Sequence, residues 1–179
     1  MIKLKDVLEG IADIVTKIEN HFIKYNSNSV TKDYEEYLED GSIEVPSTIT
    51  RDEGLIVFAY TADNTLFTKD PFKTALINVL KKLPKYSGEV YGSHKLKFAN
   101  KKITLVNILS TTTDESLLQG DDFHYSSKDR TVFKIKVKSG VSIENISLYG
   151  DQESEILLLP GTTLQVAGKS GEYVVLKEV

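Results

Sequence analysis

The hydrophobic pattern of this 179-residue chain changes its period near Gly88. Before this point, apolar residues recur every three or four positions, which is typical of amphipathic helices. After it, short runs of apolar and β-branched residues alternate with turn residues, which is typical of strands. Helices that precede strands, rather than alternate with them, predict an α+β fold built on a mostly antiparallel sheet.

Four helices are predicted in the first half, over residues 2–25, 31–39, 50–63 and 70–83. The first carries a continuous apolar stripe, and the second is more polar. Thr50 and Glu53 have the spacing of a capping box, which predicts the start of the third helix. Asp70 followed by Pro71 predicts a capped start for the fourth helix, with proline at its first position.

Seven short strands are predicted in the second half, over residues 89–91, 103–109, 132–137, 143–146, 156–159, 163–166 and 173–176. Gly168-Lys169-Ser170-Gly171 has the residue types of a phosphate-binding loop. It lacks that loop's spacing and a following helix, so a hairpin turn is the better interpretation.

Length and composition fit one soluble domain. A chain of 179 residues can bury a hydrophobic core, and its content of 40% hydrophobic and 27% charged residues is ordinary. We expect residues 1–45 to form a helical extension and residues 46–179 the main domain. Within that domain the helical lobe covers 50–84 and the β core covers 88–179. We expect the two parts to form one compact unit.

Charge and residue content disfavour several classes of function. The net charge of −4 argues against coating of nucleic acid, and the absence of cysteine excludes disulfides and thiolate metal sites. No apolar run is long enough to span a bilayer, and the N-terminal segment lacks a signal-peptide core. The chain is therefore expected to have no nucleic-acid or membrane partner.

Two carboxylates stand close together before one of the predicted strands. Glu153 and Glu155 flank a single serine at the entrance to the apolar run 156–159. Because residues i and i+2 of a strand point to the same face, we expect both carboxylates to enter one small region and to shift each other's pKa. An isolated pair of this kind is more often a solvated turn, and the rest of the chain decides between these interpretations.

Four stretches in order resemble the mono-ADP-ribosyltransferases of bacterial toxins and bacteriophages, in the class with Arg, Ser and Glu motifs and an E-x-E pair. The segment 50–84 is similar to the family's helical lobe and 85–96 to its first core strand. Residues 108–116 are similar to its Ser-Thr-Ser strand, and 151–166 to its E-x-E turn and following strand. The resemblance implies N-terminal helices followed by two mostly antiparallel sheets that form a cleft for NAD.

The resemblance also implies how the reaction is carried out. Cleavage of the bond between nicotinamide and ribose passes through an oxocarbenium-like state, which a fixed carboxylate stabilises. By the resemblance, Glu155 is that carboxylate, Glu153 orients the acceptor and takes its proton, and Ser110 holds Glu155. An E-x-E pair implies arginine as the acceptor, NAD+ as a substrate and a host protein as the partner, acted on by a monomer.

Several further residues receive expected roles from the same resemblance. Tyr91, Ser110, Thr111 and Thr112 are expected to contribute to the NAD site. Phe123, with Tyr125 beside it, falls in the loop that closes over NAD in the family, and Tyr149 is placed to touch the protein substrate.

The chain departs from the family at its first motif. The family has an arginine after an aromatic residue at the end of the first core strand, whereas this chain has Gly92 after Tyr91. That arginine grips the dinucleotide phosphates with two parallel hydrogen bonds, which other side chains replace poorly. Three explanations stay open: an inactivating change that was selected or engineered, a naturally degenerate copy, and a register that is shifted by one residue.

Three hypotheses for function follow. The first is an NAD-dependent protein mono-ADP-ribosyltransferase, a toxin or effector that acts in the cytoplasm or is delivered into a host cell by a phage or a secretion system. The second is a catalytically inactive binding module on the same fold, for which Gly92 is the evidence. The third is a structural protein without an NAD site.

The sequence does not favour a metal site. Asp121, Asp122 and His124 carry ligand atoms that metals use in proteins. Such a cluster in a polar loop is more often a solvated turn, so no metal is expected.

Overall fold

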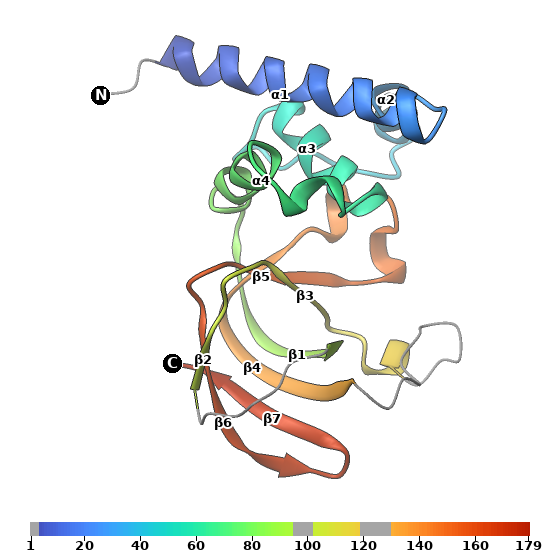
Figure 1. Cartoon of the computed structure of the whole chain (residues 1–179). Helices are drawn as coiled ribbons and strands as arrows, with labels where there is room; N and C mark the ends of the chain where they lie inside the picture. The colour runs from blue at the N-terminus through green and yellow to red at the C-terminus, as the bar shows by residue number, and fades with distance from the viewer. Residues whose placement is uncertain (1–3, 95–101, 119–129) are drawn as a thin grey trace. The chain divides into compact units, whose positions relative to one another are not determined.

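A computed structural model of the chain describes residues 4–94, 102–118 and 130–179, and places the side chains from residue 10 onward within these ranges except that of residue 151 (Figure 1). The chain divides into two compact units. The helical unit contains residues 1–83 and 145–150, and the β unit contains residues 84–144 and 151–179.

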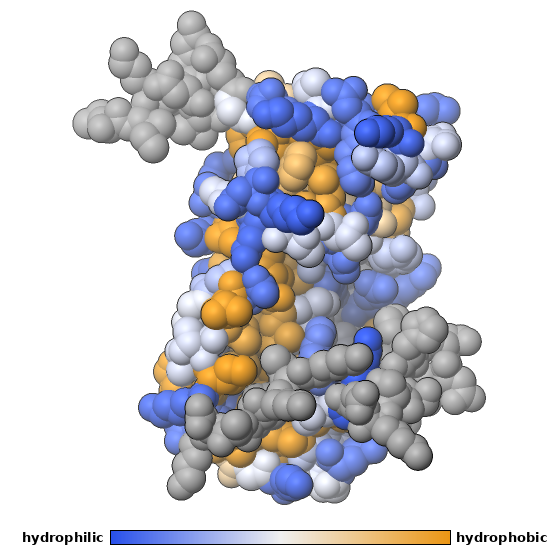
Figure 2. Space-filling view, in the orientation of Figure 1, coloured by the Kyte–Doolittle hydropathy of each residue, from blue (hydrophilic) through white to orange (hydrophobic). Residues whose placement is uncertain are grey.

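The helical unit contains four α-helices, α1 (Leu4–Tyr25), α2 (Val30–Glu39), α3 (Arg51–Ala62) and α4 (Phe72–Leu80), and a short 3-10 helix, η1 (Leu66–Thr68). The predicted extension and the predicted helical lobe thus belong to the same unit. Within the described ranges, none of the helices combines the length and apolar character that a bilayer crossing requires. Hydrophilic residues cover much of the visible surface of this unit (Figure 2).

The predicted capping box forms at the start of α3. The Thr50 hydroxyl accepts a hydrogen bond from the Glu53 amide at 3.2 Å, and the Glu53 carboxylate accepts one from the Thr50 amide at 3.0 Å. Glu53 is buried and also forms an ion pair with Lys82, just after α4. The capping box therefore satisfies the amides of Thr50 and Glu53, and the Glu53 carboxylate also ties the start of α3 to the residues after α4.

Helix α4 is shorter at both ends than predicted. Its N-cap residue is Pro71, and no side chain caps the helix. The Asp70 carboxylate instead accepts a hydrogen bond from the Thr74 hydroxyl at 2.5 Å. At the other end the chain tightens into i to i+3 bonds, with Leu83 N–H donating to the Leu80 carbonyl at 3.3 Å.

The N-terminal helices pack closely on α3. Tyr34 of α2 is fully buried, and its hydroxyl donates to the Arg51 carbonyl at 2.9 Å. The phenol lies against the backbone of Gly54, where a Cβ atom would stand 2.3 Å from the tyrosine oxygen. Glycine at position 54 therefore allows the close approach of α2 and α3.

In its described residues the β unit contains seven strands: β1 (Lys85–His94), β2 (Lys102–Thr104), β3 (Leu109–Thr112), β4 (Thr131–Ser142), β5 (Glu155–Leu158), β6 (Thr163–Ser170) and β7 (Tyr173–Glu178). Hydrogen bonds join them in the order β1-β3-β5-β4-β7-β6-β2, and β1 also pairs with β4. All pairings are antiparallel except that of β4 with β7. The sheet therefore curves back on itself as one hydrogen-bonded system, where two separate sheets were expected.

Two of the predicted strands differ from the structure. The segment 103–109 contains two strands, β2 and β3, because the chain bends at residues 106–107, where Val106 is exposed. The segment 143–146 is not a strand, and its last three residues form a 3-10 helix, η3 (Glu144–Ile146). Its two isoleucines, Ile143 and Ile146, are buried and three positions apart, which is the spacing of a single 3-10 turn.

The two faces of the sheet are distinct in β1, β3, β4 and β5. One face carries the apolar core, which contains Val90, Leu109, Phe133, Ile135, Val137, Ile156 and Leu158. Directly paired residues of antiparallel strands share a face. The pairs Lys134–Tyr91, Tyr91–Thr112 and Thr112–Glu155 therefore place these four side chains in a row on the opposite face. We call this second face the carboxylate face.

A bulge interrupts the pairing of β1 and β4 between Tyr86 and Gly88. The carboxylate of Glu178 at the end of β7 accepts hydrogen bonds from the amides of Lys138 and Ser139, at 2.5 and 2.9 Å, and from the Ser139 hydroxyl. These bonds lower the pKa of Glu178 despite its partial burial. The glutamate therefore satisfies amides that the bulge removes from the ladder.

Candidate active site

The two carboxylates of the E-x-E pair lie at the start of β5. Glu155 is the first residue of the strand, whereas Glu153 belongs to the turn before it. Ser154 between them has φ +43°, in the left-handed region. The expectation that strand alternation brings the carboxylates together is therefore wrong, because a left-handed turn and not an extended strand connects them.

Glu155 is held by the hydroxyl of Ser110. The side chain of Glu155 is on the carboxylate face and only 7% of the residue is exposed. Ser110, two positions before Thr112 in β3, shares this face, and its hydroxyl donates a hydrogen bond to the Glu155 carboxylate. The hydrogen bond that the resemblance predicted is present, and β3 supplies its donor.

The environment of Glu155 favours its protonated form. The pKa of Glu155 is raised from 4.5 to about 7, chiefly by burial; the Ser110 hydrogen bond acts to lower it and the nearby charge of Glu153 acts to raise it. Burial also raises the pKa of Glu153. Two carboxyl groups that influence each other in a buried setting are typical of acid–base and cation-stabilising sites, although structural pairs share this property.

The next two residues of the Ser-Thr-Thr segment have different surroundings. Thr111 is on the core face, where its hydroxyl donates to the Ile156 carbonyl at 2.6 Å. Thr112 is on the carboxylate face, donates to the Glu153 carbonyl at 2.7 Å and accepts from the Asp114 amide at 3.0 Å. Thr112 thus fixes the turn that carries Glu153, while the Thr111 side chain faces away from the carboxylates.

Gly92 faces the core and not the carboxylates. It pairs with Phe133 of β4, and a Cβ atom at position 92 would stand 2.7 Å from the ring carbon Cε2. The expectation that position 92 replaces the phosphate-binding arginine is not supported, because a side chain there would extend into the apolar core. On β1, the positions that share the face of Glu155 are Tyr91 and Ser93, which fits the register shift of one residue.

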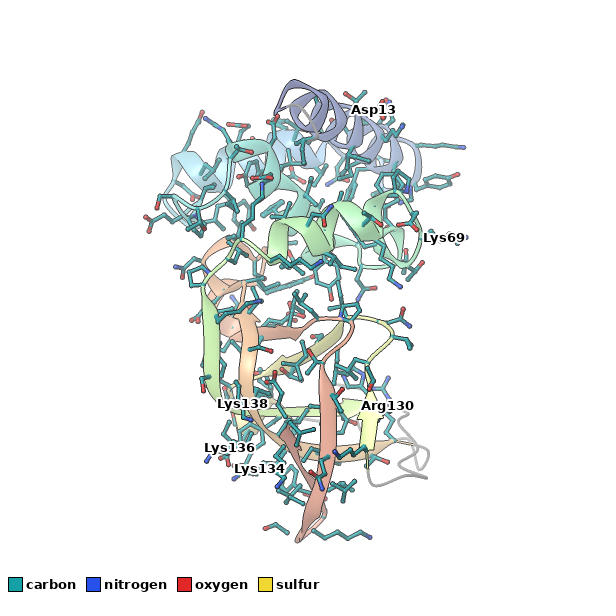
Figure 3. All side chains as sticks on the ribbon, turned by 90° about the vertical axis from the view of Figure 1, so that its left-hand side faces the viewer. Asp13, Lys69, Arg130, Lys134, Lys136 and Lys138 are labelled. Carbon is teal, nitrogen blue, oxygen red and sulfur yellow. The ribbon has the colours of Figure 1, made fainter. Side chains whose placement is uncertain are left out.

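Sequence reasoning missed a lysine on the carboxylate face. Lys134 is paired with Tyr91 across β1 and β4, its ammonium lies 2.7 Å from Glu89, and it stands 5.4 Å from the centre of the Tyr91 ring. Figure 3 shows Lys134 and Lys136 side by side along β4. The alternation of lysine with apolar residues in 132–137 was the available signal, since it marks a strand with one charged face.

Tyr91 contacts both Lys134 and the ring of Tyr173. Its hydroxyl donates to the Glu89 carboxylate at 3.0 Å, and its ring lies edge-on to Tyr173 of β7, with 6.2 Å between ring centres. Tyr91 is almost completely buried. Its expected place beside the NAD site is compatible with its position in the row that ends at Glu155.

The remaining predicted residues lie elsewhere. Tyr149 belongs to the helical unit, where it is 41% exposed and its amide donates to the Ser147 hydroxyl at 3.1 Å. Phe123 and Tyr125 fall outside the described residues, as do Asp121, Asp122 and His124. Over the described ranges, no group of three or more histidine, aspartate and glutamate side chains is arranged to hold a metal ion.

Comparison with solved structures identifies the fold. The Vis toxin, an ADP-ribosyltransferase from Vibrio splendidus, is 19% identical over 84% of each chain, with a TM-score of 0.57. The eukaryotic mono-ADP-ribosyltransferase ART2.2 is 15% identical over 98% of this chain and 85% of its own, with a TM-score of 0.65. HopU1 of Pseudomonas syringae pv. tomato DC3000, also an ADP-ribosyltransferase, is 15% identical over 92% of this chain and 87% of its own, with a TM-score of 0.55.

These matches are structural only. No protein-family model and no curated protein matches the chain by sequence. Helices followed by a mostly antiparallel sheet, and a similarity that extends over most of both chains, nevertheless agree with the fold that the sequence predicted. The chain therefore has the ADP-ribosyltransferase fold.

Proposed function

We propose that this chain is an NAD-dependent mono-ADP-ribosyltransferase that modifies a protein on arginine. The observation that carries the proposal is the buried carboxylate of Glu155, hydrogen-bonded to Ser110 and influenced by Glu153, on a chain with this fold. Residues from two separate strands and a turn meet at one point of the sheet. A purely structural strand end has no need of a buried carboxyl group with a raised pKa.

The chemistry assigned to Glu155 is stabilisation of a positive charge. The bond between C1′ of the ribose and the nicotinamide nitrogen breaks, nicotinamide leaves with the bonding electrons, and the ribose becomes cation-like. An ionised carboxylate beside the ribose favours this state, in the way that carboxylates assist glycoside cleavage. The Ser110 hydrogen bond favours the ionised form and fixes its orientation.

Glu153 is assigned to the acceptor. The nitrogen of the incoming guanidinium attacks C1′, and its proton passes to Glu153 as the new bond forms. Burial raises the pKa of Glu153, so it takes a proton more readily than an exposed glutamate would. Arginine as the acceptor is supported by the structure of Vis in complex with agmatine, which carries a guanidinium group.

The dinucleotide is assigned to the carboxylate face of β1, β3, β4 and β5. An ART2.2 mutant has been solved in complex with NAD, which supports NAD+ as the substrate of this fold. The two arginines of this chain are Arg51, in α3, and Arg130, exposed just before β4. We assign the phosphate contact to Lys134, which lies in the row Lys134–Tyr91–Thr112–Glu155.

Lysine offers a weaker phosphate contact than arginine. Its ammonium is a point charge that cannot bind two phosphate oxygens with a fixed fork. Here it is also engaged by Glu89, at 2.7 Å. We therefore expect NAD to bind more weakly than in a site with arginine, by roughly 10-fold if one charged hydrogen bond is lost.

The target is proposed to be a host protein. HopU1 and the type III effector XopAI of Xanthomonas axonopodis pv. citri are among the structural matches, the latter with 12% identity and a TM-score of 0.54. A role as a toxin or effector, carried by a bacterium or a phage, is consistent with these structural matches. Tyr149, exposed in the helical unit, is the residue we assign to contact with the target.

Two measurements test the proposal. The first is a thermal-shift titration of the purified chain with NAD+, because a ligand that binds only the native state raises its melting temperature. The second is transfer of a labelled ADP-ribose group from NAD+ to agmatine or to proteins of a host lysate, with Glu155→Gln as the control. Stabilisation by NAD+ without transfer to either acceptor would replace the enzyme with the second candidate.

That second candidate is an inactive binding module. It is favoured by one observation, the lack of an arginine at the strand positions of the carboxylate face, where β1 has Tyr91 and Ser93. A module of this kind would bind NAD or a protein partner on the same face without turnover.

A further inference from the structure

The hydroxyl of Ser93 is buried without a partner. Only 3% of Ser93 is exposed, and its Oγ atom is the one buried side-chain oxygen or nitrogen within the described ranges that makes no hydrogen bond. Burial of a hydroxyl without a hydrogen bond is unfavourable, and most buried polar side chains are satisfied. An orphaned hydroxyl therefore calls for an explanation.

Ser93 lies beside the carboxylate pair. It follows Tyr91 by two positions in β1, so the two side chains share the carboxylate face. Tyr91 is paired with Thr112, and the antiparallel register continued by two residues brings Ser93 opposite Ser110. The adjacent contact agrees with this placement, because the His94 ring nitrogen Nε2 lies 2.9 Å from the Ser110 carbonyl.

Two serines therefore stand next to each other at this point of the sheet. The hydroxyl of Ser110 is used by Glu155, whereas the hydroxyl of Ser93 is not used by any described group. A ligand that displaces the side chains covering Ser93 would meet an uncommitted hydroxyl there.

We propose that Ser93 is a positioning residue for the bound dinucleotide, and that its hydroxyl forms a hydrogen bond with an uncharged polar group of NAD+, either the carboxamide of nicotinamide or a ribose hydroxyl. The inference rests on the proposed function and adds a residue to its site. An uncharged group is favoured because the residue paired directly with Ser93 across β1 and β4 is the apolar Val132, and Lys134, one same-face step along β4, is engaged by Glu89.

The proposal predicts opposite effects on the free and the bound protein. Ser93→Ala removes a hydroxyl that has no partner in the free protein, so the melting temperature without ligand stays the same or rises. The same change removes one hydrogen bond to NAD+, so the affinity for NAD+ falls by roughly 2- to 10-fold, the effect of one neutral hydrogen bond.

Ser139→Ala is the matched control. Ser139 lies on the same sheet, but its hydroxyl donates to Glu178 in the free protein. Its loss lowers the melting temperature without ligand and leaves the affinity for NAD+ unchanged. Ser93→Cys provides a second variant of nearly the same size with a poor hydrogen-bond donor, and it should weaken NAD+ binding to the same extent as alanine.

Fragments of the ligand locate the contact. Calorimetric titrations of the wild type and Ser93→Ala are carried out with NAD+, nicotinamide and ADP-ribose. A loss of affinity for nicotinamide assigns the hydroxyl to the carboxamide, and a loss for ADP-ribose assigns it to a ribose hydroxyl.

These experiments distinguish a failure of the proposed function from a failure of the role assigned to Ser93. Wild-type protein that binds neither NAD+ nor its fragments overturns the proposed function and this inference together. Wild-type protein that binds NAD+ while Ser93→Ala binds it equally well overturns only the role of Ser93. A fall in the melting temperature of ligand-free Ser93→Ala comparable to that of Ser139→Ala would show that the hydroxyl serves the fold and would also overturn it.

Discussion

Gly92 and Phe133 stand opposite each other on the core face of β1 and β4, and the aromatic ring occupies the space that a side chain at position 92 would need. The missing Cβ atom would lie 2.7 Å from Cε2 and 3.2 Å from Cζ of Phe133, which is fully buried. A glycine opposite an aromatic residue therefore has a structural explanation in this sheet. The presence of glycine at position 92 therefore does not have to be explained by the loss of a functional arginine.

Gly92→Arg is expected to destabilise the protein and not to restore NAD binding. The new side chain enters the core at Phe133, and overpacking of this kind costs about 1–3 kcal/mol even for an apolar group, with a buried charge adding to the cost. Gly92→Ala should also destabilise the protein, by less. Urea unfolding and calorimetric titration with NAD+ measure both effects.

Gly10→Ala is the control for this prediction. Gly10 is exposed in α1 and has no atom within 4 Å of its missing Cβ, so alanine should stabilise the helix by about 0.5–1 kcal/mol. Stable Gly92→Arg protein with tightened NAD binding would contradict the placement of position 92 on the core face.

The stability of the protein should depend on the ionisation of Glu155. Its pKa is about 7 in the folded state and near 4.5 when exposed, so the folded state holds the proton more strongly. The contribution of Glu155 to the free energy of unfolding is therefore largest below pH 4.5. It falls as the pH rises from 4.5 to 7, by about 1.4 kcal/mol for each pH unit. Above pH 7 its contribution is constant.

Glu155→Gln removes this dependence. The gain in unfolding free energy of the variant over the wild type should be larger at pH 8 than at pH 5, as measured by urea unfolding. Glu36→Gln, a change at an exposed carboxylate of α2, is the control and should show no comparable difference between the two pH values. An equal gain at both pH values for Glu155→Gln would show that its carboxyl group is not shifted.

Ser110→Ala should move the pH dependence of catalysis. The Ser110 hydrogen bond lowers the pKa of Glu155, so its removal raises that pKa further. If ionised Glu155 is required, the rising limb of kcat/KM against pH lies near 7 in the wild type and shifts to higher pH in the variant. The loss of one hydrogen bond to a charged group corresponds to about 1.5–3 kcal/mol.

Thr111→Val tests whether this shift is specific. It removes a neighbouring hydroxyl whose bond is to the Ile156 carbonyl on the core face. This variant should lose about 1 kcal/mol of stability and keep the pH profile of the wild type. A shift of the rising limb in Thr111→Val would attribute the effect to general loosening of β3.

The two glutamates should differ in what they abolish. Glu155→Gln removes the carboxylate that stabilises the ribose cation, so both transfer to agmatine and hydrolysis of NAD+ are lost. Glu153→Gln removes only the group that serves the acceptor, so transfer is lost while much of the hydrolysis remains. Release of nicotinamide, measured with and without agmatine, separates the two activities. Equal loss of both activities in the two variants would contradict this division of roles.

Local patterns in the sequence determined the class of the fold and most of its elements. The stripe of 2–25, the capping box of Thr50 and Glu53, and the short apolar runs after Gly88 all depend on contacts within a few residues of the chain. For that reason α1, α3 and five of the predicted strands appear close to their predicted places. The family resemblance implied that Ser110 and Glu155 are partners, and the structure places them in contact.

Only the tertiary structure decided which face each side chain takes. Tyr91 and Gly92 differ by one position, and alternation along a strand sends one to the carboxylates and the other to Phe133. The sequence does not fix that choice, because it depends on the pairing of β1 with β3 and β4, in which the partners of Tyr91 are the distant residues Thr112 and Lys134. The unpaired hydroxyl of Ser93 is likewise invisible without the burial that these strands create together.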